Sequence, residues 1–148
     1  MGQWLGIDHG TKRIGVAVGN TADGIALPVR VLTDQPFETA ARRIADLAHE
    51  YGAEGIVVGW PLNMDDTEGP QGRKTRAWAV RLAKITELDV RLWDERLSSF
   101  AADKALAGTF TRKQKRDRQD AVAAAETLQD FLSSRGPESA PRPDQIAT

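Results

Sequence analysis

The chain has no cysteine among its 148 residues and only two histidines, His9 and His49. Without cysteine it can form neither a disulfide nor a zinc site built on thiolates. A bound metal would therefore be held mainly by oxygen ligands. That chemistry favours Mg²⁺ or Mn²⁺ over zinc.

Long apolar runs are also missing. No stretch approaches the roughly 18 residues that a membrane-spanning helix needs, and the N-terminus has no basic-then-apolar signal pattern. We therefore expect a cytoplasmic protein without a membrane partner.

A large charge of either sign is absent as well, because the net charge is −1 at pH 7. The basic residues nevertheless gather in three clusters: Lys12 and Arg13; Arg73, Lys74 and Arg76; and, most densely, Arg112, Lys113, Lys115, Arg116 and Arg118. A local basic cluster can contact phosphates even when the total charge is near zero. The alternative is a solvated charged face, which three clusters near candidate acids make less attractive.

The order of predicted elements indicates a mixed α/β domain. Residues 3–8, 13–19 and 25–32 have strand patterns separated by turns, which favours an antiparallel meander. A helix is predicted over 37–51 with Gly52 as its stop. Residues 55–59 form a continuous apolar run, typical of a strand buried on both faces.

The second half continues with alternating helices and strands. A polar loop over 61–70 follows the buried strand, at the edge where open α/β sheets place ligands. Further elements are a helix over 76–85, a fifth strand over 90–93, a short helix over 98–106 and a last helix over 118–132. We expect one domain over 1–134, with a mixed five-stranded sheet (three antiparallel strands, then parallel strands) flanked by helices on both faces. The Pro-rich residues 135–148 are predicted to be a disordered tail.

Acidic residues stand at the ends of three predicted elements: Asp8, the pair Asp94 and Glu95, and the pair Asp117 and Asp120. Asp117 and Asp120 are three apart, so both share a helix side with apolar residues. An acid on such a stripe is costly unless it is neutralised, and a divalent cation shared with the other acids would do that. Two alternatives stay open. Asp8 could cap a turn, and the helix acids could interact only with the helix dipole.

This arrangement suits hydrolysis of a phosphodiester. Two hard cations held by carboxylates can activate the attacking water and neutralise the leaving oxygen. No histidine or cysteine nucleophile is required. His9 follows Asp8 directly at a strand end and should face away from it, as a turn or substrate-side residue rather than a ligand.

Four motifs follow one another along the chain: LGIDHGTKRIGVA at 5–17, VVGWPLNMD at 57–65 with Glu68 and Gly69, DERLSS at 94–99, and Asp120 with Ala123, Ala124, Leu128 and Gln129. Together and in this order they resemble the YqgF/RuvX family. The resemblance spans about residues 4–132. The departures, at His9, Trp60 and Ser98-Ser99, remove no proposed ligand.

The resemblance implies an RNase H-like fold and a nuclease, that is, a hydrolase acting on ester bonds. Members are described as nucleases that mature the 5′ end of pre-16S rRNA in ribosome biogenesis, or as Holliday junction resolvases active in DNA recombination. Asp8, Glu95 and Asp120 match the family's acidic triad and would be the catalytic and metal-binding residues. Asp94 and Asp117 would be auxiliary acids.

The expected partner is nucleic acid, either precursor rRNA or branched DNA, with the ribosome as a further candidate. We expect its phosphates to be contacted by Lys12, Arg13, Asn63, Arg96, Arg112, Lys113, Lys115 and Arg116. Junction cleavage would require a homodimer, whereas end trimming can proceed in a monomer. Two alternatives remain: a non-catalytic nucleic-acid or ribosome-binding module, which would gain nothing from buried acids near phosphates, and an actin-like ATPase, which needs two such domains.

Overall fold

The computed structural model describes residues 2–10, 12–33, 36–63, 65, 67–94, 112–133 and 140–143, with the backbone alone described over 112–119. Five strands form one sheet in the order β3-β2-β1-β4-β5. Strands β1 (Gln3–His9), β2 (Arg13–Asn20) and β3 (Ala26–Thr33) are antiparallel. Strands β4 (Ala53–Trp60) and β5 (Asp89–Asp94) run parallel to β1. The predicted mixed sheet is therefore confirmed.

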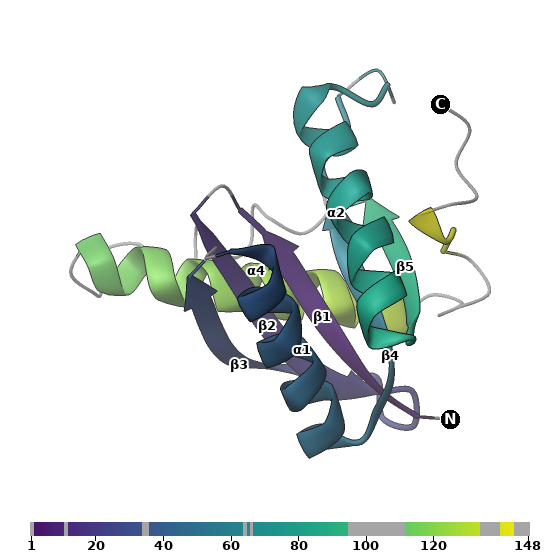
Figure 1. Ribbon diagram of the computed structural model, residues 1–148. Coiled ribbons are helices and arrows are strands. Elements are labelled where there is room, and N and C mark those ends of the chain that lie inside the picture. Colours follow the sequence, from purple (N-terminus) through teal and green to yellow (C-terminus); the bar gives the residue numbers. More distant parts are fainter. Residues whose placement is uncertain are drawn as a thin grey trace.

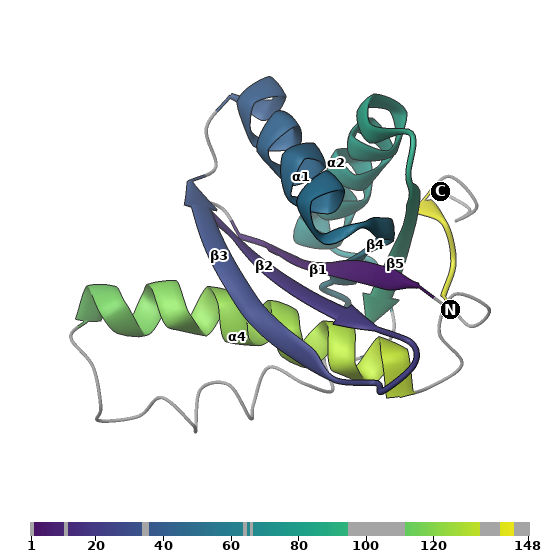
Figure 2. The same cartoon turned by 90° about the horizontal axis from the view of Figure 1, so that it is seen from below.

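Helices cover both faces of this sheet. Helices α1 (Phe37–Tyr51) and α2 (Pro70–Thr86) lie on one face, and the long helix α4 (Arg112–Ser133) crosses the other (Figures 1 and 2). Alternation along β1 divides the core accordingly. Leu5 and Ile7 belong to the cluster under α1 and α2. Trp4 belongs to the cluster that includes Phe131 of α4.

Helix boundaries agree with the sequence for α1 and differ for the other two. Helix α1 ends at Gly52, which adopts the left-handed conformation with φ 64° that glycine accepts at helix ends. Helix α2 begins at Pro70 rather than at residue 76, because proline is well tolerated in the first helical turn. Helix α4 begins at Arg112 rather than at residue 118, since arginine, lysine and glutamine are good helix formers. The helix predicted over 98–106 lies outside the described residues.

Residues 140–143 lie beside the outer edge of β5. The Leu92 backbone N–H donates to the Pro141 carbonyl at 2.9 Å, and Arg91 Nη1 donates to the Ala140 carbonyl at 2.8 Å. Ala140 is buried. An edge strand offers backbone groups that lack a sheet partner, so residues 140–143 are held at β5, with Ala140 and Pro143 buried and Pro141 and Arg142 exposed. The domain boundary at residue 134 remains a prediction.

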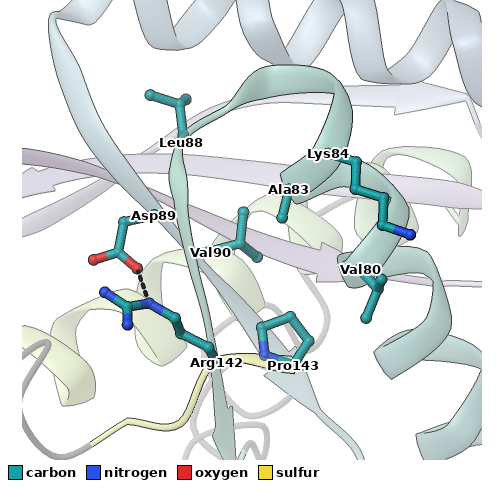
Figure 3. Close-up of a pocket in the computed structure, with 8 residues that line it drawn as sticks. All are labelled: Val80, Ala83, Lys84, Leu88, Asp89, Val90, Arg142 and Pro143. Atoms are coloured by element: carbon teal, nitrogen blue, oxygen red, sulfur yellow. Dashed lines mark hydrogen bonds and ion pairs between the residues drawn. The ribbon is translucent and has the colours of Figure 1, made fainter. Parts of the chain in front are cut away.

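A cavity of about 220 Å³ lies where β5 begins, between the end of α2 and residues 142–143 (Figure 3). Arg142 Nε donates to Asp89 Oδ1 at 3.2 Å across one wall. This cavity opens at the start of β5, away from the strand end that carries Asp94. Among the described helices, none is both long and apolar enough to cross a membrane.

Candidate active site

Asp8 lies near the end of β1 on the face covered by α4. Two residues back along the strand, a Cβ at Gly6 would lie 2.8 Å from the Ala124 carbonyl of α4. Trp4 packs on Phe131 with ring centroids 5.0 Å apart. Because side chains alternate along a strand, Asp8 shares this face. Its cross-strand partner on β2 is Gly15.

Gly15 brings α4 onto the sheet directly beside Asp8. A Cβ at this position would overlap the Asp120 carbonyl group and would lie 2.9 Å from Ala121 N. Only glycine leaves room for a helix backbone this close to a strand. The register of β1 with β2 and the approach of α4 together bring the backbone of Asp120 onto the strand next to Asp8.

Arg13 forms an ion pair with Asp120 at the start of β2. Its Nε lies 2.6 Å from Asp120 Oδ2, and the two side chains are 27% and 20% exposed. Arg13 and Gly15 are two residues apart on one strand, so both face α4. We predicted that Arg13 would contact substrate phosphate. In the structure its positive charge offsets the Asp120 carboxylate, which partial burial would otherwise make costly.

The acids after β5 are described only in part. Asp94 ends β5 beside Trp60 of β4. Trp93 donates its Nε1–H to Asp130 of α4 at 2.8 Å, so alternation turns Asp94 to the opposite face. Glu95 and Arg96 lie outside the described residues. The predicted side chains on the first turns of α4 do too: Arg112, Lys113, Lys115, Arg116 and Asp117. Within the described part, no three histidine, aspartate or glutamate side chains come together.

The loop between β4 and α2 is held by Glu68, a residue that the sequence analysis placed in a family motif without predicting its contacts. Arg76 donates Nε and Nη2 to the two Glu68 carboxylate oxygens at 2.8 and 2.9 Å. Trp60 donates its Nε1–H to Glu68 Oε2 at 3.0 Å. The Arg76 hydrogen bonds lower the pKa of Glu68, against the opposing effect of burial. The signal in the sequence was an acid just before a proline-started helix with an arginine two turns further on.

Asn63 closes the same loop from its other end. Its backbone N–H donates to the Thr67 carbonyl at 2.9 Å, and its Nδ2 donates to Thr67 Oγ1 at 2.9 Å. These contacts tie Asn63 to Thr67 next to the end of β4. The substrate role predicted for Asn63 stays a prediction. Lys12, also predicted to bind substrate, is exposed beside the turn after β1.

His9 lies on the other face of the sheet from Asp8. It stacks on Trp78 of α2, with ring centroids 4.3 Å apart and ring planes 16° from parallel. The predicted orientation, away from Asp8, is confirmed.

Comparison with known proteins shows which family the chain matches. The model of a family described as "RuvX: Holliday junction resolvase" matches residues 2–134. A relative from Rhodobacter capsulatus, named "Putative pre-16S rRNA nuclease", is 42% identical over 133 residues, which is 89% of this chain and 84% of the relative. A relative of the same name from Rhodopseudomonas palustris is 44% identical over 88% of this chain and 81% of its own length.

Among solved structures, the chain resembles Thermus thermophilus RuvC in complex with a Holliday junction substrate, with a TM-score of 0.57 and 16% sequence identity. The match covers 95% of this chain and 98% of that one. At this identity the likeness concerns the fold, which is the RNase H-like fold that the sequence predicted. Because the family model spans nearly all of the described sheet and helices, the chain belongs to the RuvX family.

Proposed function

We propose that this protein is a metal-dependent nuclease that hydrolyses phosphodiester bonds while processing the 5′ end of pre-16S rRNA. The observation that carries the proposal is the approach of Asp8 on β1 to Asp120 on α4 across Gly15. Neighbouring carboxylates can hold the divalent cations that phosphodiester hydrolysis uses. The names of the 42–44% identical relatives support RNA as the substrate.

The residues present fit a hard divalent cation. Asp8 and Asp120 offer only oxygen donors, which Mg²⁺ and Mn²⁺ prefer. Asp120 already forms an ion pair with Arg13, so a bound cation would share this carboxylate with the guanidinium group. We assign Asp8, Asp120 and Glu95 as the residues that would hold the metal. When bound, such cations activate water and neutralise the leaving oxygen.

The chain's own cations would position the substrate. Lys12 is exposed beside the turn next to Asp8, and Arg13, which pairs through Nε with Asp120, would contact phosphate with its remaining N–H groups. Such contacts fix position without reading bases. Glu68, held by Arg76, would fix the side of the site that lies at the end of β4 and the start of α2. The basic first turns of α4, which begin at Arg112, would extend the grip along the backbone.

Cleavage of a precursor rRNA leader in Mn²⁺ tests the assignment. We expect Asp8→Asn and Asp120→Asn to lose roughly 100-fold or more in rate, since even residues that merely support metal ligands cost 10–100-fold when replaced. Asp46→Asn is the matched control, because Asp46 is an exposed carboxylate on α1. Parent-like rates in both site variants would contradict the proposal.

Metal binding can be tested without any substrate. A cation that binds only the folded state raises the melting temperature by mass action. Mn²⁺ should therefore stabilise the parent, and the rise should largely vanish in Asp120→Ala. A Mn²⁺-induced rise in melting temperature as large in Asp120→Ala as in the parent would show that Asp120 is not a metal ligand.

Cleavage of four-way DNA junctions is a second candidate, favoured by the description of the matching family model. It would need two active sites acting together, and hence a dimer. The same assay with a four-way junction, together with a mass measurement in solution, separates the two substrates. Tight RNA binding with no cleavage of either substrate would instead identify a binding module.

A further inference from the structure

A second cationic site lies at the free edge of the sheet. A cavity of about 260 Å³ is lined by residues 30–33 of β3 and by Thr39, Ala40 and Arg43 of α1. Arg30 and Arg43 supply two guanidinium groups, and the threonines add hydroxyl donors. Within the described part of the chain neither arginine has an ion-pair partner, and no carboxylate lines the cavity. Its chemistry is that of an anion site.

A β-bulge aims Arg30 at this cavity. Along β3, Pro28 pairs with Ala17 of β2, but Arg30 pairs with Val16, so Val29 is an extra residue. Without it, Arg30 would oppose Gly15 and face α4. With it, Arg30 opposes Val16, whose side chain is in the core under α1. Bulges commonly redirect a side chain near a functional site.

Helix α1 supplies the other side of the cavity lining. Thr39 and Arg43 are four residues apart, which puts them on the same side of the helix. Both are exposed. Neighbouring Arg42 is equally exposed but does not line the cavity. The helix therefore carries two adjacent arginines, of which only one faces the cavity.

The cavity lies close to the proposed active site. Asp8 pairs with Gly15, and Gly15 pairs with Val31, so these residues form one row across β1, β2 and β3. With strands about 4.8 Å apart, the Cα atoms of Asp8 and Val31 are separated by roughly 10 Å. Val31 lines the cavity, and β3 is the edge strand of the sheet. Because α4 covers Gly15 on the Asp8 face and the cavity opens on the α1 face, a strand of nucleic acid leaving Asp8 would pass the end of the sheet near Thr33 to reach Arg30 and Arg43.

We propose that Arg30 and Arg43 bind a backbone phosphate of the nucleic-acid substrate a few nucleotides from the bond that is cleaved. The proposal rests on the proposed nuclease function and adds a second point of attachment to it. Guanidinium groups match phosphate oxygens with paired hydrogen bonds, and the hydroxyls of Thr33 and Thr39 can complete the contact. Such a contact positions the strand and is indifferent to base sequence.

Binding of a labelled single-stranded RNA in the presence of a chelator tests the site separately from cleavage. We expect Arg30→Gln and Arg43→Gln each to weaken binding roughly tenfold at low salt, as loss of a charged hydrogen bond does. The two substitutions together should reduce the magnitude of the log–log salt slope by about 0.7, the value for one phosphate contact on a single strand, and each alone should give part of this reduction. Arg42→Gln is the control, with the same charge change on the next residue, and should leave the slope unchanged.

Cleavage kinetics supply the second readout. Both variants should raise KM and leave kcat unchanged, because the lost contact is remote from the scissile bond. With RNAs shortened progressively on one side of the cleavage position, the variants and the parent should converge once the distant phosphate is gone.

Equal salt slopes for Arg43→Gln and Arg42→Gln would overturn the proposal. So would saturation of the cavity by inorganic phosphate alone at concentrations that leave RNA binding unaffected, because the site would then serve a free anion. A parent protein that binds RNA normally but cleaves nothing would refute the proposed nuclease function and leave this test intact.

Discussion

Gly15 gives the sharpest test of how the site is assembled, through the variant Gly15→Ala. The added methyl group would overlap the Asp120 carbonyl and lie 2.9 Å from Ala121 N, where ordinary contact starts at 3.4 Å. Both contacts are with backbone atoms of a helix, so rotation of a side chain cannot relieve the overlap. Helix α4 must therefore move off β2 by at least about 0.5 Å to clear Ala121 N, and by more to clear the carbonyl.

The magnitude follows from packing. Overfilling a well-packed interior typically costs about 1–3 kcal/mol, and contact with helix backbone puts this variant near the upper end. A loss of about 3 kcal/mol corresponds to roughly 6–12 °C in melting temperature for a domain of this size. The displacement also separates Asp120 from Asp8. A misplacement of about 1 Å can cost on the order of 100-fold in rate.

Two measurements are needed, a urea unfolding curve and the cleavage rate in saturating Mn²⁺ at a temperature where the variant is folded. Gly19→Ala is the matched control. A Cβ there would meet Ile25 O at 2.6 Å and Leu132 Cδ1 at 2.8 Å, so the same helix and strand are overfilled. Gly19 is four residues further along β2, about 13 Å from Gly15.

We expect both variants to lose stability and only Gly15→Ala to lose activity in its folded state. Parent-like activity in folded Gly15→Ala would show that the approach of α4 at this point does not set the catalytic geometry. Equal losses of activity in both variants would show that general loosening of α4, rather than the position of Asp120, is responsible.

Three further outcomes are expected. Glu68→Gln should destabilise the protein by about 1–2 kcal/mol, because it weakens charged hydrogen bonds from Arg76. Limited proteolysis should then cut the variant faster than the parent between residues 61 and 69, and an equal cutting rate would contradict the role given to Glu68. Folding lowers the pKa of Glu68, so the carboxylate stabilises the folded protein above its unfolded pKa, and this stabilisation is lost as pH falls through the folded pKa. The difference in unfolding free energy between the parent and Glu68→Gln should therefore close in acid. A difference that is constant with pH would count against the ion pair. Truncation after residue 139 should lower the free energy of unfolding, measured in urea, by about 1–3 kcal/mol, because the hydrogen bonds to Leu92 and Arg91 are lost. The Mn²⁺-induced rise in melting temperature should stay intact. An unchanged urea midpoint would mean that residues 140–143 do not hold β5.

The sequence alone determined the strands, their order along the chain and the position of the first helix. The short apolar runs of β1 and β2, the apolar run at 55–59 and Gly52 are local signals, and local signals act through backbone sterics and burial of a single element. The same reasoning gave Asp8 and Asp120 as site candidates and turned His9 away from Asp8. It gave the wrong starts for α2 and α4, because a proline at the first helical position and a run of basic residues both read as loop.

Tertiary structure decided which of these residues meet. Nothing near Arg13 in the sequence indicates that its partner is Asp120, since that contact depends on a register between strands and on a glycine that admits a helix. The packing of residues 140–143 on β5 is likewise a long-range contact. The bulge at Val29 is the clearest case. Whether Arg30 faces α4 or α1 depends on one extra residue in the pairing of β3 with β2, and pairing is a property of the assembled sheet.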